Sequence, residues 1–182
     1  MGLPWSETAT ASMTRKGAFP MYFKQADIFW GMNKAFIKAV MKNAVQETHQ
    51  AGIRLFAEGE AAIHFYILLK GKVKLSIGET GKLVYIVSHA GEAFGWSSLI
   101  ERDVYSATAD CKAQTKLMKL DKETIQKALD DDPASGLLFF RRIAETLGNR
   151  LLQSYAMISS VHTAEAVPSY GTGQVQDLGA DI

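Results

Sequence analysis

The spacing of apolar residues changes twice along the chain, from a helical period to a period of two and back again. Residues 1–20 are rich in small and polar types and have no periodic apolar face, so a mobile arm is expected there. From residue 34 to 43 apolar side chains recur at helical spacing, while Lys34, Lys38 and Lys42 fall on another face. This pattern predicts a short amphipathic helix capped by Asn33.

The following segment alternates with a period of two and is punctuated by glycine at close intervals. The expected strands are 65–69, 73–77, 82–87, 105–111 and 115–120. We expect the first two to form a hairpin around Lys70-Gly71-Lys72, and residues 78–81 to turn the chain into the third. Because no helix of ten or more residues separates these strands, the pattern favours an antiparallel barrel or sandwich over parallel pairing.

Helical spacing returns at Asp121, a predicted N-cap with Glu123 in the first turn. A sharper boundary follows at residues 130–133, where three aspartates precede Pro133. A carboxylate at the N-cap and a proline at the first helical position predict a second helix that runs to about Val161.

The long helix carries an apolar seam at alternating spacings of three and four residues. The seam consists of Leu137, Phe140, Ala144, Leu147, Leu151, Ser154, Ile158 and Val161. A seam of this length is typical of a two-stranded coiled coil, so we predict a homodimer through this helix. The alternative is that the same stripe packs on its own barrel, and a second apolar flank at Leu138, Ile143, Leu152 and Tyr155 allows both.

The expected organisation is therefore an arm at 1–20, a β-rich domain at 21–132, a helix at 133–162 and a disordered tail at 163–182. The tail contains Pro168 and three glycines and has few apolar residues.

The amino-acid composition excludes several classes of protein. The 182 residues are 47% hydrophobic, enough for one sizeable core, and 20 basic against 19 acidic side chains exclude a strongly basic nucleic-acid-binding protein. Cys111 is the single cysteine, which excludes an intrachain disulfide and a paired-cysteine metal site. There is neither an apolar run of eighteen residues nor an evident secretory signal, so a cytoplasmic location without membrane attachment is expected.

Three motifs resemble the cyclic-nucleotide-binding domain of catabolite-activator-type bacterial regulators. Residues 56–60 (Phe-Ala-Glu-Gly-Glu) resemble the turn after that family's second strand, residues 65–73 its glycine-containing hairpin, and residues 91–95 the start of its phosphate-binding cassette. The resemblance covers roughly residues 28–160. It implies an antiparallel double-stranded β-helix, or jelly roll, with flanking helices and a long C-terminal dimerisation helix.

The cassette departs from the family pattern at its two charged positions. The family's glutamate, which binds the ribose hydroxyl, corresponds to Trp96, and its arginine, which pairs with the cyclic phosphate, corresponds to Tyr105. Each charge-assisted hydrogen bond contributes on the order of 1.5–3 kcal/mol, so tight binding of cAMP or cGMP through the usual contacts is not expected. The ligand-binding residues that the resemblance implies are Phe94, Gly95, Trp96, Ser97, Ser98, Leu99, Tyr105, Ser106, Ala107 and Thr108.

Two interpretations of this cassette stay open. In the first, it binds a different anionic, nucleotide-like or planar molecule, using a short helix over residues 95–99, serine hydroxyls, Arg102 or the two aromatic faces. In the second, Trp96 and Tyr105 fill the cavity, and the domain is a ligand-free interaction module.

Nothing in the sequence argues for catalysis. The four histidines, His49, His64, His89 and His162, are isolated, so a metal site of the cupin type is a third and weaker hypothesis. In regulators of this family a winged helix-turn-helix follows the long helix. Only the glycine- and proline-containing tail follows it here, so we expect no direct DNA binding and a regulatory role through a protein partner or a dimer.

Overall fold

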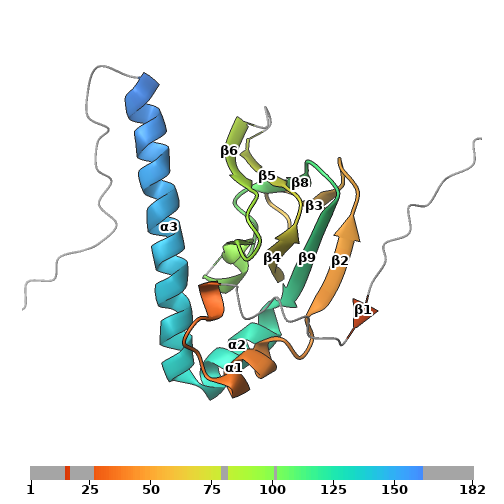
Figure 1. Ribbon diagram of the computed structural model, residues 1–182, viewed down its shortest axis with the longest axis vertical. Coiled ribbons are helices and arrows are strands. Elements are labelled where there is room, and N and C mark those ends of the chain that lie inside the picture. The colour runs from red at the N-terminus through yellow and green to blue at the C-terminus, as the bar shows by residue number, and fades with distance from the viewer. Residues whose placement is uncertain (1–14, 17–26, 79–81, 101, 162–182) are drawn as a thin grey trace, which may run out of the picture. The chain divides into compact units, whose positions relative to one another are not determined.

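The computed structural model describes residues 15–16, 27–78, 82–100 and 102–161, which divide between two compact units, residues 1–144 and residues 145–182 (Figure 1). The strands are β1 (Arg15–Lys16), β2 (Val45–His49), β3 (Arg54–Phe56), β4 (His64–Lys70), β5 (Val73–Ile77), β6 (Lys82–Val87), β7 (Ala93–Phe94), β8 (Thr108–Cys111) and β9 (Thr115–Asp121). The helices are the 3-10 turns η2 (Asp27–Phe29) and η3 (Trp96–Leu99), and the α-helices α1 (Lys34–Val40), α2 (Lys122–Asp131) and α3 (Pro133–Val161).

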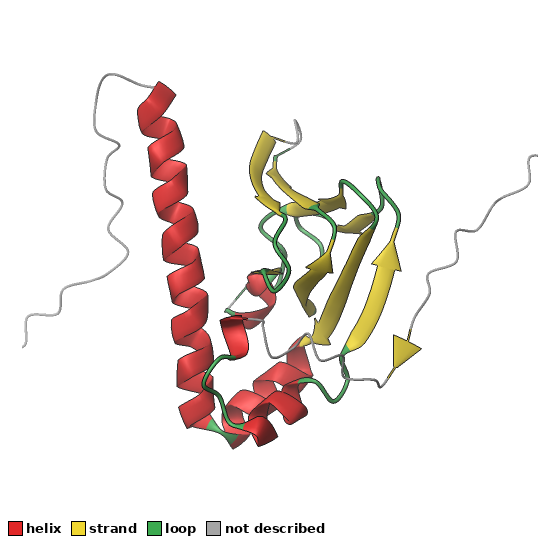
Figure 2. Ribbon diagram, in the orientation of Figure 1, coloured by secondary structure: helices red, strands yellow, loops and turns green. Residues whose placement is uncertain are grey.

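The strands, yellow in Figure 2, form two antiparallel sheets. One has the order β1-β2-β9-β4-β7 and the other the order β3-β8-β5-β6. Every described strand pair is antiparallel. The expected mainly β fold with flanking helices is confirmed. It follows from the sequence because the short strands have no crossover helix between them.

Alternation along β4 and β9 creates a separate hydrophobic core on each face of the first sheet. Phe65, Ile67, Met118 and Leu120 face the helices and join one buried cluster. Tyr66, Leu68 and Leu117, which are their neighbours in sequence, join a second cluster with side chains from β3, β5, β6 and β8. Successive side chains of a strand point to opposite faces, so two strands supply both cores.

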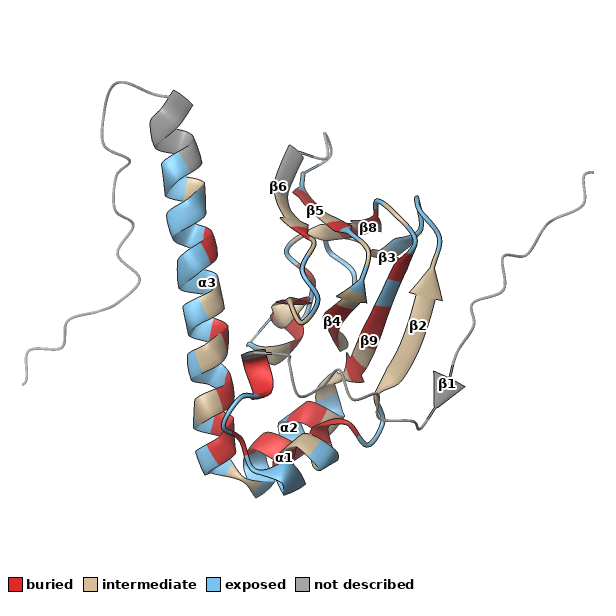
Figure 3. Cartoon of the chain, in the orientation of Figure 1, coloured by how far each residue is buried: buried red, intermediate tan, exposed pale blue. Residues whose placement is uncertain are grey.

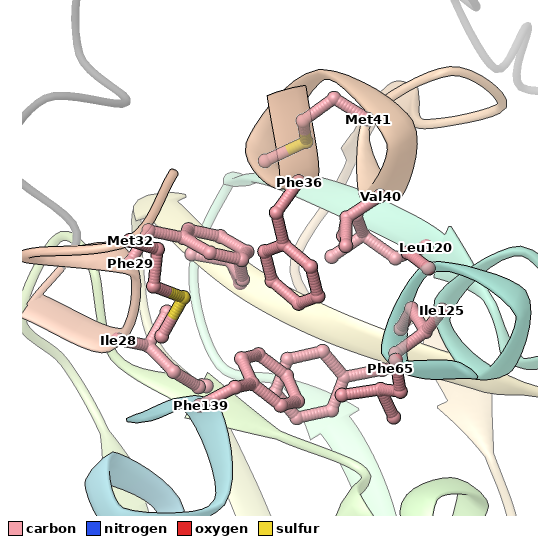
Figure 4. Packing of buried hydrophobic residues seen from close by; sticks show 14 of the residues in the cluster. Ile28, Phe29, Met32, Phe36, Val40, Met41, Phe65, Leu120, Ile125 and Phe139 are labelled. Carbon is pink, nitrogen blue, oxygen red and sulfur yellow. The ribbon is translucent and has the colours of Figure 1, made fainter. Parts of the chain in front are cut away.

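Phe139 on α3 is the centre of the helix-side core (Figure 4). Its ring is fully buried and packs against Phe29 of η2, Phe36 of α1 and Phe65 of β4, with ring centroids 5.9, 6.2 and 6.1 Å away. The start of α3 is therefore fixed to two other helical elements and to the sheet within residues 1–144.

The three predicted helix starts have their expected caps. Asn33 Oδ1 accepts a hydrogen bond from Ala35 N at 2.9 Å, and Asp121 Oδ2 accepts one from Thr124 N at 2.9 Å. Asp132 Oδ1 accepts from Ser135 N at 3.1 Å, directly before Pro133. Among the helices within the described ranges, none combines the length and apolarity needed to cross a membrane.

The predicted hairpin at residues 70–72 is wrong. β4 pairs with β7 and β9, whereas β5 pairs with β6 and β8, so the chain passes from one sheet to the other at this point. Gly71 allows the crossing, because its φ is 108° and a Cβ there would lie 2.6 Å from Gln114 O. The predicted reversal of the chain between residues 73–77 and 82–87 is confirmed, since Ile77 of β5 pairs with Lys82 of β6.

Two further expectations need correction. Residues 15–16 of the expected mobile arm form β1, which pairs with β2, since an edge strand needs backbone partners rather than a periodic apolar face. The other residues of that arm, and the tail from 163, lie outside the described residues. The strand expected from Tyr105 begins only at Thr108, because the backbone of Tyr105 pairs with Gly59 and Glu60 in a neighbouring loop.

Helix α3 places buried and exposed side chains on different faces (Figure 3). Phe139 and Ile143 are buried, whereas the seam residues Leu137, Phe140, Leu147 and Leu151 are 64%, 39%, 36% and 51% exposed. Ala144 is exposed and Ser154 half-buried, while the side chains of Ile158 and Val161 lie outside the described residues. The seam is thus separate from the face that packs into the helix-side core.

Candidate functional site

The cassette predicted from the sequence turns at Gly95, in a backbone conformation that favours glycine. Gly95 has a φ of 79°, which a residue with a Cβ rarely adopts, and an added Cβ would meet the Tyr66 ring at 3.0 Å and His64 O at 3.2 Å. This close approach to β4 sets the direction of η3. The buried Ser98 hydroxyl then donates to Gly95 O at 2.9 Å and closes the turn.

Tyr105, which the resemblance aligns with the family's arginine, is turned into the sheet-side core. It is 3% exposed, and its ring stacks on Phe56 with centroids 3.8 Å apart. Its hydroxyl donates to His64 O at 2.8 Å and accepts from His64 N at 3.0 Å. Burial raises the pKa of the phenol and hydrogen bonds with His64 and Tyr66 partly offset this, so Tyr105 is neutral at pH 7.

Trp96, which the resemblance aligns with the family's glutamate, is half-buried and packs against the helix-side core together with Leu99. Phe94 is fully buried in the sheet-side core, as is the ring of Tyr105. The side chains of Trp96 and Tyr105 therefore enter different cores.

Two polar residues of the cassette, Ser97 and Ser106, form hydrogen bonds with each other. Ser97 is buried, and its Oγ lies 3.3 Å from Ser106 Oγ and accepts a hydrogen bond from Ser106 N at 3.3 Å. Ala107 is half-buried and Arg102 is exposed. Ligand binding by the ten cassette residues stays a prediction.

Thr108 belongs to a different place, a polar pocket of about 480 Å³ on the four-stranded sheet. The pocket is lined by residues of β3, β5 and β8 and by the ends of the adjoining turns: Arg54, Glu58, Lys74, Ser76, Thr108 and Asp110, with Gly78 at the end of β5. Of these residues, only Thr108 was predicted from the sequence to bind a ligand. The sequence of β5 could have indicated the pocket, because the polar residues Lys74 and Ser76 alternate with the apolar residues Val73, Leu75 and Ile77. The polar pair therefore lies on the face of the strand opposite to the core residues Val73 and Leu75.

A second group of ionisable side chains lies on the first sheet. Glu47 accepts from Lys119 Nζ at 2.6 Å and lies 2.9 Å from His49 Nε2. Burial alone would raise the pKa of Glu47, but the hydrogen bonds from Lys119 and His49 outweigh it and leave the pKa lowered. For the half-buried His64, burial and the nearby Lys119 charge lower the pKa, which favours the neutral imidazole.

Replacing Glu47 with glutamine is expected to lower the free energy of unfolding by about 1 kcal/mol at pH 7. A carboxylate with a lowered pKa stabilises the fold above its ordinary pKa of 4.5, and this contribution is lost as the pH falls through the lower folded-state pKa. Urea unfolding at pH 7 and at pH 3 measures both values. The difference between the two proteins should shrink at pH 3, and a difference that persists there contradicts the assignment. Asp131→Asn, at an exposed carboxylate, is the control.

Neither the single cysteine nor the other possible metal ligands form a reactive site within the described residues. Burial raises the pKa of the Cys111 thiol, which disfavours the reactive thiolate. Within the described ranges, no three or more His, Cys, Asp or Glu side chains converge as metal ligands. The expectation that the protein is not a metal enzyme stays a prediction, which metal analysis of the purified protein would test.

Comparison with known proteins gives one family and several structural relatives. Residues 46–132 match the model of the cyclic nucleotide-binding domain. A CRP-like cAMP-activated global transcriptional regulator of Mycobacterium tuberculosis is 23% identical over 125 residues. That match covers 68% of this chain but 56% of the relative, so this chain corresponds to little more than half of that protein.

Two solved structures share the fold. A cyclic nucleotide-binding domain from Methylobacillus flagellatus is 19% identical, with a TM-score of 0.66 over 80% of this chain and 86% of that one. The sensor domain of the transcriptional regulator DNR from Pseudomonas aeruginosa is 20% identical, with a TM-score of 0.57 over 68% of this chain and 85% of that one. At this level of identity the likeness concerns the fold alone.

Proposed function

Since residues 46–132 belong to the cyclic nucleotide-binding domain family, we propose that the chain is a non-catalytic, cytoplasmic regulatory domain whose cassette does not hold cAMP or cGMP. Such a domain senses a different small molecule or acts through its dimer surface. Occupancy of a ligand site would bias the junction near residues 130–133, where α2 meets α3.

The observation that supports this proposal is the orientation of Tyr105. A guanidinium at this position would offer a phosphate a charged, forked donor. The phenol offers one neutral hydroxyl, and that hydroxyl already makes two hydrogen bonds to the backbone of His64. A bound phosphate would have to break them and would gain no ionic contact.

Calorimetry with cAMP and cGMP tests the proposal. We expect no saturable heat at nucleotide concentrations up to about 1 mM, because the charged contacts that account for most of such affinity are absent. Micromolar binding of either nucleotide would overturn the proposal. A Tyr105→Phe variant would then report whether the phenol contributes, since it removes the hydroxyl and keeps the ring.

The exposed seam of α3 favours a second candidate function, that of a ligand-free dimerisation module. Leu137, Phe140, Leu147 and Leu151 present apolar surface along a helix whose other face is buried at Phe139 and Ile143. A coiled-coil partner, most simply a second copy of this chain, would remove that surface from water. The two functions are compatible, because a sensor can act by changing how the two helices pair.

A further inference from the structure

We propose that the polar pocket on the four-stranded sheet is a second ligand site, which shares only Thr108 with the predicted cassette, and that it takes a small zwitterion carrying one cationic and one anionic group, such as a free α-amino acid. The pocket faces away from the sheet-side core. Its lining residues Lys74 and Ser76 alternate along β5 with Val73 and Leu75, which belong to that core.

The register of the strands arranges the charges in a row. Lys74 of β5 lies opposite Asp110 of β8, and Asp110 lies opposite Arg54 of β3. Opposite positions on neighbouring antiparallel strands bring side chains within reach of each other. The row therefore alternates in sign across three strands, and Glu58 adds a second carboxylate.

Only some of these charged groups are paired within the protein. Arg54 Nε donates to Asp110 Oδ1 at 2.9 Å, so these two charges compensate each other. The side-chain ammonium of Lys74 has no ion pair or hydrogen bond to any described residue. Glu58 Oε2 accepts from Gly78 N at 2.7 Å, which leaves its other oxygen available. One ammonium and one carboxylate oxygen remain for a ligand.

Two hydroxyls lie opposite each other between these charges. Ser76 pairs in register with Thr108. Thr108 Oγ1 accepts from Glu58 N at 3.0 Å and keeps its own proton to donate, while the Ser76 hydroxyl makes no hydrogen bond within the described part of the chain. The donors lie beside the lysine, so a ligand carboxylate is expected at Lys74 and a ligand ammonium at Glu58.

The balance of charge and the size of the pocket decide the ligand class. Two cations and two carboxylates line it, so its formal charge is zero and a multiply charged anion is not favoured. A volume of about 480 Å³ lies within the range of pockets that hold small ligands. A compact molecule with separated charges of both signs matches this lining.

Calorimetry of the full chain at pH 7 with a panel of the free α-amino acids tests the site. We expect at least one to bind with a dissociation constant below about 1 mM, and its N-acetyl and carboxamide derivatives, which each lack one charge, to bind at least about tenfold more weakly. Lys74→Gln should weaken binding at least about tenfold, while Lys72→Gln, which removes an exposed charge beside the same strand, should leave it unchanged. Circular dichroism verifies that both variants are folded.

Three results would overturn the proposal. They are absence of binding across the panel, equal binding of a derivative with one charge, and equal binding by the Lys74→Gln variant. The cyclic-nucleotide titration reports on the cassette and does not depend on Lys74, so failure of this site and failure of the proposed function are distinguishable.

Discussion

Replacing Phe139 with alanine is expected to lower the free energy of unfolding by about 3–5 kcal/mol. The ring is fully buried and contacts aromatic side chains from η2, α1 and β4, so its removal leaves a cavity bounded by rigid elements that cannot all close in. Domains of this size are stable by about 5–15 kcal/mol, so the variant should be near the limit of folding. Urea unfolding followed by circular dichroism measures the change.

Trp30→Ala is the matched control for Phe139→Ala. It also replaces an aromatic ring with alanine, but Trp30 is 68% exposed, so the expected loss is below about 1 kcal/mol. A Phe139→Ala protein within 1 kcal/mol of the parent would contradict the central role of this residue in the helix-side core.

Replacing Leu147 with aspartate is expected to weaken dimerisation by at least about a hundredfold. In the proposed coiled coil each Leu147 would be enclosed by the partner helix, and a carboxylate there would lose its hydration without gaining a counter-charge. Light scattering combined with size-exclusion chromatography over a range of protein concentrations measures the effect.

Leu152→Asp is the control for Leu147→Asp, because it places the same charge on α3 outside the seam. Leu152 is 65% exposed and lies on the same helix outside the seam, so the same substitution there should leave the mass unchanged. If the Leu147→Asp protein keeps the mass of a dimer, or if the parent chain is a monomer at all concentrations, the seam is not a homodimer interface.

The features that could be predicted from the sequence are those that depend on local chemistry. Asn33, Asp121 and Asp132 cap helices as expected. A short polar side chain just before a helix accepts a hydrogen bond from a backbone N–H of the first turn, and this depends only on neighbouring residues. The mainly β architecture also followed from glycine spacing and from the absence of crossover helices.

The features that could not be predicted depend on contacts between distant segments. Residues 65–69 and 73–77 look like a hairpin in sequence, but the space that Gly71 leaves beside Gln114 decides that they belong to different sheets. The position of Tyr105 in the cassette could be read from motif spacing. Its rotation into the core could not, because the backbone groups it binds lie about forty residues earlier in the chain. The polar pocket on the four-stranded sheet could not be predicted either, because its lining depends on the register of β3, β5 and β8.

The paired hydrogen bonds between Tyr105 and His64 also constrain how this domain can evolve. A single mutation of Tyr105 to arginine would not restore a phosphate clamp, since the guanidinium would replace a buried ring and the His64 amide would lose its acceptor. A residue at position 105 must both donate to His64 O and accept from His64 N to keep the start of β4 in place. The tyrosine is therefore tied to the backbone of a distant strand, and position 105 tolerates few other side chains.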